Sequence, residues 1–191
     1  MKHVLKPWPS DEIVQVLADR SDGYFIYAST VLKYVDEEYP SCIDRLREIL
    51  ELSKSGSPAF GELDKLYRQI LSVYPDTDLL LRVLGCLLTS VRFPVRLFKS
   101  ESAESLRAIL GLHPGQVEHI LRGLHSVLDV RVSVNHTLRV KGPFHASFPQ
   151  FFFDETRAGR YYINQENINE DIVRGTADLM RDYHNRKSSL G

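Results

Sequence analysis

The feature that most constrains the fold of this chain is a change in hydrophobic period near residue 128. Before that point, apolar side chains recur every three or four residues, the spacing of α-helices that bury one face. From residue 130 to residue 140 the period falls to two, which is typical of β-strands. The pair Asn135-His136 between the alternating runs suits a tight turn. We therefore predict one β-hairpin with a buried valine face that includes Val132.

Three helices are predicted directly before the hairpin. The first begins just after Pro75, the second lies between a Ser102 cap and Gly111, and the third begins at Pro114. Three helices followed by a β-hairpin is the order of a winged helix. We place this winged-helix domain at residues 76–154.

The rest of the chain is also predicted to be helical. Residues 1–55 form an N-terminal helical lobe, residues 56–75 a connecting helix, and residues 155–191 a linker and a terminal helix that starts at Asn167. In the lobe, residues 24–28 are all apolar or aromatic, so we expect the helix that they begin to be buried on most sides. The predicted fold class is mainly α: a helical bundle lobe, a winged-helix domain with a small β-hairpin, and a terminal helix.

The composition describes a packed protein with balanced charge. Of 191 residues, 24 are basic and 25 are acidic, and the formal net charge is −1. No global field would hold such a chain on nucleic acid or on an anionic membrane. Cys42 and Cys86 both lie in apolar helical patterns, which indicates buried thiols in a reducing compartment rather than metal ligands. The sequence has no signal-peptide core and no membrane-length apolar run, so we expect a cytoplasmic protein without a membrane partner.

The sequence patterns that carry common catalytic chemistry are absent. The chain lacks the phosphate-binding loop Gly-x-x-x-x-Gly-Lys-Ser/Thr and the paired acids that end a Walker B strand. It also lacks Gly-x-Ser-x-Gly and His-Glu-x-x-His. The histidines His113, His119 and His125 are six residues apart, which turns them to different sides of a helix. We therefore predict no enzyme activity, no catalytic residues and no metal site.

Short motifs, taken in order, carry a resemblance to a known family. They occupy residues 22–30, 57–71, 110–117, 121–129, 145–148 and 156–162. Together they resemble the helical and winged-helix region that follows the NTPase core in fungal NACHT-type, NWD-like ATPases of the STAND class. The resemblance covers residues 8–182. The NTPase core and the downstream repeats of such proteins are not matched, so we expect a gene fragment or a truncated paralogue.

The resemblance implies a role for His145, the first residue of His-Ala-Ser-Phe. In the STAND class, a histidine at this place contacts the β-phosphate of bound ADP and holds the switch closed. An imidazole N–H beside free backbone N–H groups at a helix start can bind a phosphate oxygen. The alternative is that His145 only caps or packs the helix. The sequence departs from the family at Gln150, where an acidic residue is usual, and at Pro149.

The resemblance thus implies a non-catalytic regulatory and interaction module of a signal-transduction switch, of the kind found in innate immunity. Its expected partner is the NTPase core of a related NACHT protein, or another protein. We expect no cofactor on the chain alone, and ADP or ATP only together with such a core. The alternative is a nucleic-acid-binding winged helix. Specific DNA binders commonly make roughly six to ten phosphate contacts. The winged helix offers fewer cations than that, which disfavours nucleic acid; they are Arg122, Arg131, Arg139 and Lys141.

Overall fold

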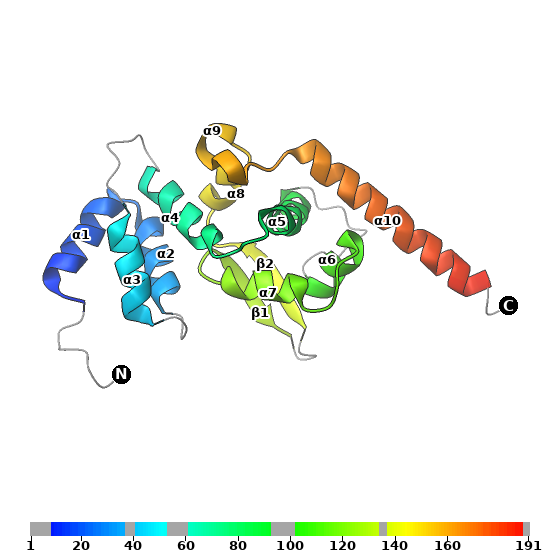
Figure 1. The fold of residues 1–191 in the computed structure, drawn as a ribbon, viewed down its shortest axis with the longest axis horizontal. Coiled ribbons are helices and arrows are strands. Elements are labelled where there is room, and N and C mark those ends of the chain that lie inside the picture. The colour runs from blue at the N-terminus through cyan, green and yellow to red at the C-terminus, as the bar shows by residue number, and fades with distance from the viewer. Residues whose placement is uncertain (1–8, 37–40, 53–60, 93–101, 134–136, 189–191) are drawn as a thin grey trace. The chain divides into compact units, whose positions relative to one another are not determined.

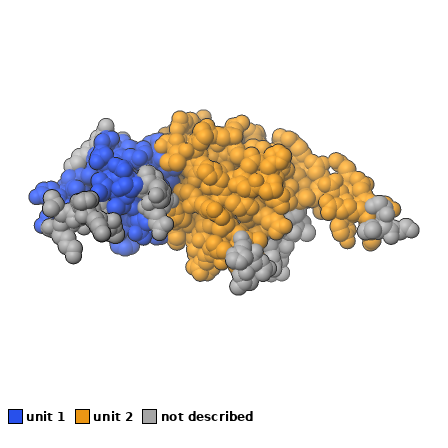
Figure 2. Space-filling view, turned by 60° about the horizontal axis from the view of Figure 1, so that its bottom comes forward, with its two compact units in different colours: residues 1–70 blue, residues 71–191 orange. Residues whose placement is uncertain are grey.

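The computed structural model describes residues 9–36, 41–52, 61–92, 102–133 and 137–188. The chain divides into two compact units, residues 1–70 and residues 71–191, which are coloured separately in Figure 2. The predicted fold class is confirmed, because the described residues are mainly helical, with one small β-hairpin and a terminal helix (Figure 1). Within these ranges, no helix combines the length and the apolar character needed to cross a membrane. The finer division of the chain into four regions stays a prediction.

The first unit contains short helices that pack through single faces. They are α1 (Asp11–Ser21), α2 (Phe25–Val35), α3 (Cys42–Glu51) and most of α4 (Gly61–Ser72). Helix α2 buries Tyr27, Val31 and Tyr34, which share one side of the helix. The guanidinium of Arg20 donates to the carbonyl oxygen of Ile49 at 2.6 Å, and so satisfies one of the C-terminal carbonyl groups of α3.

The opposite side of α2 is exposed. Phe25 is 83% exposed and Leu32 is 69% exposed, although both belong to a largely apolar helix. Nine of the eleven residues of α2 are buried or half-buried, so the expectation that this helix would be buried on most sides fails only at Phe25 and Leu32. Helix α2 packs on α1 and α3, and its most deeply buried side is the one that carries Tyr27.

The second unit contains the winged helix. Its elements are α5 (Thr77–Arg92), α6 (Ala103–Leu110), α7 (Gln116–Gly123), β1 (Leu128–Val132) and β2 (Leu138–Pro143). The side chain of Ser102 caps α6, and Gly111, with a φ of 63°, follows its last residue, as predicted. Helix α7 begins after Gly115 rather than at Pro114, because the N–H of Gly115 donates to the Glu118 carboxylate at 3.0 Å and forms a cap there.

Strands β1 and β2 pair antiparallel in the register that the alternation predicts. Val130 faces Val140 and Val132 faces Leu138, so these side chains lie on one face of the sheet. Val140 and Leu138 are buried, but Val132 is 66% exposed. The prediction of a buried Val132 was therefore wrong, because the face is buried only where the helices cover it and not at the outer end of β1.

The predicted turn of the hairpin, Asn135-His136, lies outside the described residues. Ser102, which precedes α6, forms an isolated antiparallel bridge with Arg139 of β2. This extended residue gives β2 a second neighbour, and a short strand between the first two helices is part of the winged-helix connectivity.

The chain after the hairpin continues as helices. They are α8 (Ser147–Phe152), α9 (Glu155–Ala158), the 3-10 helix η1 (Gly159–Tyr161) and α10 (Gln165–Ser188). Helix α10 begins before Asn167, the predicted start. The cause is the side chain of Asn164, whose Oδ1 accepts from the N–H of Glu166 at 2.8 Å and so caps the helix earlier.

Helix α10 lies against α5 and α6, and glycine residues permit the close approach (Figure 1). Gly175 lies on the backbone of α6, where any side chain would overlap the carbonyl oxygen of Ile109. Gly85 of α5 similarly leaves space for the buried side chain of Ile168. The first half of α10 is therefore fixed on the winged helix by contacts that larger residues would exclude.

We predict that Val140→Asp destabilises the fold by about 3 kcal/mol or more, because it would bury an unpaired carboxylate. The matched variant Val132→Asp should change the free energy of unfolding by no more than about 0.5 kcal/mol, because that side chain is exposed. Urea unfolding of both variants measures the difference. Equal unfolding midpoints for the two variants would contradict the burial pattern of the hairpin.

We predict that Gly175→Ala destabilises the protein by about 1–3 kcal/mol, because the added methyl group collides with Ile109. This loss should appear although alanine favours a helix over glycine by about 1 kcal/mol. Arg174→Ala, at the exposed neighbouring position, is the control and should be close to neutral. Thermal unfolding compares the two, and a Gly175→Ala variant as stable as the control would exclude the close crossing.

Candidate functional site

His145 lies between β2 and α8. Its Nδ1 accepts a hydrogen bond from the backbone N–H of Ser147 at 3.1 Å, and it lies 2.8 Å from Ser147 Oγ. A backbone N–H can only donate, so Nδ1 carries no proton in this arrangement and the neutral ring bears its proton on Nε2. His145 Nδ1 thus accepts the N–H of the first residue of α8 from one position before the N-cap residue Ala146, and His145 is an exposed residue.

The helix that follows His145 is held by aromatic packing. Phe148, Phe151 and Phe152 are buried, and their rings meet edge to face with centroids 5.0 and 5.2 Å apart. Pro149 lies in the first turn of α8, as predicted, where a missing N–H costs little. The buried phenylalanines therefore fix the position of α8, and with it the hydrogen bond between Ser147 and His145.

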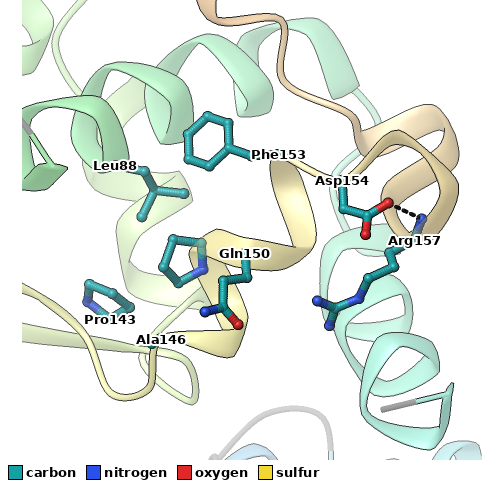
Figure 3. A pocket seen from close by; sticks show the side chains of 8 residues that line it. Leu88, Pro143, Ala146, Gln150, Phe153, Asp154 and Arg157 are labelled. Atoms are coloured by element: carbon teal, nitrogen blue, oxygen red, sulfur yellow. Dashed lines mark hydrogen bonds between the residues drawn. The ribbon is translucent and has the colours of Figure 1, made fainter. Parts of the chain in front are cut away.

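Asp154 forms the start of the next helix. Its Oδ1 accepts from Thr156 Oγ1 at 2.6 Å and from the backbone N–H groups of Thr156 and Arg157 at 3.0 and 3.2 Å. The hydrogen bond from the Thr156 hydroxyl is the largest cause of a lowered pKa at Asp154, and the backbone donors add to it. The carboxylate is thus engaged as the cap of α9, and the close-up shows its bond to Arg157 (Figure 3).

A pocket of about 550 Å³ opens beside α8. Its apolar wall includes Leu88 of α5, Pro143 of β2 and Phe153, and its polar residues include Gln150 and Arg157 (Figure 3). Mostly apolar pockets of this size with a few polar groups are typical of sites for small ligands or single side chains.

Only some of the residues singled out from the sequence line this pocket. Pro149 and Gln150, the departures from the family pattern, both line it, whereas His145 does not and only its neighbour Ala146 does. Leu88 and Phe153 could not be chosen from the sequence, because the fold alone brings them together. The one available signal was the run of aromatic residues after His145.

The other candidate residues have separate contacts. His119 meets the ring of Tyr74 edge-on, with centroids 6.1 Å apart, and His125 Nδ1 lies 3.1 Å from the carbonyl oxygen of Arg122. In the described part of the chain, no group of three or more His, Cys, Asp or Glu side chains is placed to hold a metal ion.

The two cysteines differ in burial. Cys86 is buried, and this burial, with the nearby charge of Asp171, raises the pKa of its thiol to about 12. Cys42 is only half-buried at the start of α3, so the expectation of two buried thiols was wrong for this residue. Its place at the first position of the helix, at the edge of the unit, explains the exposure.

One of the cations on the described strands of the wing is held in an ion pair. The guanidinium of Arg131 donates to both carboxylate oxygens of Asp129, each at 2.9 Å. This bidentate pair offsets one of the positive charges that nucleic-acid binding would use. Arg122, Arg139 and Lys141 are exposed.

The chain was compared with protein-family models, with curated proteins and with solved structures, and none of the three comparisons gave a match. The resemblance to NACHT-type ATPases thus stays a prediction based on short motifs. Among the motifs, the one that begins at His145 has the best-defined polar geometry, since its ring is fixed on one side and exposed on the other.

We predict that the neutral imidazole of His145 is protonated on Nε2 and not on Nδ1, because Nδ1 accepts the Ser147 N–H. Long-range ¹H–¹⁵N spectra distinguish the two tautomers through the ring nitrogen shifts. Ser147→Ala removes the hydroxyl but keeps the N–H, so the same tautomer should persist. A proton on Nδ1 in the wild-type chain would contradict this hydrogen bond.

Proposed function

We propose that this chain is a non-catalytic regulatory and interaction module of a NACHT-type signalling switch that works in the cytoplasm. It docks on the NTPase core of a related protein and brings His145 to the phosphates of ADP bound there. The observation that carries the proposal is the fixed imidazole of His145, whose Nδ1 is bound to the Ser147 N–H while the ring is exposed.

The chemistry of this imidazole suits a phosphate oxygen. Its Nε2–H is a donor whose direction is set by the hydrogen bond on the other side of the ring. A hydrogen bond to a charged oxygen is roughly twice as strong as one between neutral groups. The ring therefore favours a core that holds ADP over an empty core, and such a difference is what allows a ligand to shift a switch.

One imidazole is not enough to hold a nucleotide. Tight sites use a phosphate-binding loop with several backbone N–H groups and a lysine, and this sequence has no such loop. The isolated chain should bind ADP no more tightly than about 1 mM, which corresponds to roughly 4 kcal/mol. The partner core must therefore supply most of the nucleotide contacts, and His145 adds one.

The exposed side of α2 supports the docking step. Phe25 and Leu32 are seven residues apart and lie on one side of the helix, 83% and 69% exposed. Large apolar side chains that gather on a surface in this way mark interaction sites between proteins. A partner core that covers this side would supply the burial that α1 and α3 do not.

The docking prediction is tested by titrating the full chain into the NTPase core of a fungal NACHT protein, with ADP and without nucleotide, in a calorimeter. His145→Ala should weaken binding to the ADP-loaded core about tenfold, as expected for one charge-assisted hydrogen bond, and should leave binding to the empty core unchanged. Phe25→Asp should weaken both, because it removes an apolar contact and not a phosphate contact.

Val132→Asp is the matched control for Phe25→Asp, since it also places a carboxylate at an exposed apolar position. It should bind like the wild-type chain. If His145→Ala binds the ADP-loaded core as well as the wild type does, the chain is a packing module without a sensor function. If the wild-type chain binds neither form of the core at roughly 100 μM, the docking step itself is wrong.

A further inference from the structure

Helix α10 carries an apolar stripe that the second unit leaves exposed. Val173 is 68%, Met180 59% and Tyr183 69% exposed. Their spacings of seven and three residues place them on one side of the helix, and Thr176, which is half-buried with an enclosed hydroxyl, lies beside them. The side of α10 that carries Ile168 is already occupied, because it is buried against α5 and α6.

The second half of α10 extends beyond α5 and α6 (Figure 1). Residues 181–188 are all exposed. A helical segment shorter than about 12 residues is marginal in water when nothing packs on it. A partner that covers the stripe would therefore stabilise this half of the helix.

A hollow on α10 indicates the form of that partner. Asn169, Glu170, Val173 and Arg174 of α10 are among the residues that line it. In a coiled coil, four residues of one helix form the hole that receives a single side chain from the facing helix. Tyr183, on the same stripe, is a large exposed side chain of the kind that fills such a hole.

We propose that a second copy of this chain covers the stripe, with the two α10 helices antiparallel about a two-fold axis at the level of residue 178. In this register Val173 faces the second copy's Tyr183, and Thr176 faces the second copy's Met180. Each Tyr183 then enters the hollow of the other copy. A two-fold axis uses the same patch on both copies, so the assembly ends at a dimer and does not extend to a chain of copies.

The charges of α10 select the antiparallel orientation. It brings Glu170 beside His184 and Lys187 of the second copy, and Arg174 beside the Tyr183 ring of the second copy, where a cation–π contact forms. A parallel pair would instead place Lys187 against Lys187 and would separate Glu170 from the basic end of the second copy's helix. Like charges at such positions repel, so the parallel pair is disfavoured.

Sedimentation equilibrium of the full chain tests the pairing. We expect a dimer at roughly 100 μM. Tyr183→Asp should weaken the dimer by about tenfold or more, while the control Asn185→Asp, on the opposite side of α10, should not change its dissociation constant. Phe25→Asp should leave the dimer intact, which separates this surface from the exposed side of α2.

Cross-linking tests the register. In a Cys42→Ser background, Ala177→Cys should give a covalent dimer with a short thiol-to-thiol cross-linker, and Asn185→Cys should give none. Cys86 should not react, because burial raises the pKa of its thiol to about 12.

Three results would overturn the proposal. If the chain stays monomeric at roughly 100 μM, the stripe does not bind a second copy, and its partner is a different polypeptide. A dimer that survives Tyr183→Asp, or that Phe25→Asp dissociates, would place the contact elsewhere. Equal cross-linking at positions 177 and 185 would exclude the register.

Discussion

The candidate site depends on the burial of the phenylalanines of α8. Phe148, Phe151 and Phe152 are each no more than 1% exposed. Truncating one such ring in a core typically costs about 3–5 kcal/mol, so the core and not the short helix fixes the position of α8. His145 lies two residues before α8 and accepts the Ser147 N–H at its start, so the direction of its imidazole follows from the same packing.

The crossing of α10 on α6 decides which side of the terminal helix remains exposed. Gly175 must face the backbone of α6, and Asp171 on the same side accepts a hydrogen bond from Arg82 Nε of α5 at 2.8 Å. With that side directed inward, Val173 and Tyr183 lie on other sides of the helix and are 68% and 69% exposed. The apolar stripe is therefore a consequence of how the helix is anchored.

Local chemistry made much of the fold predictable from the sequence. The Ser102 cap and the Gly111 stop depend on side chains close to them in the chain, and both were predicted. Burial depends on distant segments, so Phe25 and Val132 were predicted inside and lie outside. The candidate site shows the same division. A single histidine such as His145 has no pattern of its own and was chosen only through the resemblance, and the pocket beside α8 appears only when distant segments meet.

The segment that carries His145 and the helix that carries the stripe, α10, pack on the same hydrophobic core. The N–H of Ile163 donates to the carbonyl oxygen of Phe152 at 2.9 Å, which ties the end of α8 to the segment that leads into α10. Ile163 and Ile168 both lie at Gly85 of α5, where a side chain would collide with Ile168. Because interiors are close-packed, a contact that displaced α8 would have to displace the start of α10 as well. Docking at His145 and pairing along α10 would thus involve the same packed core. The two contacts are compatible with each other if neither of them displaces α8.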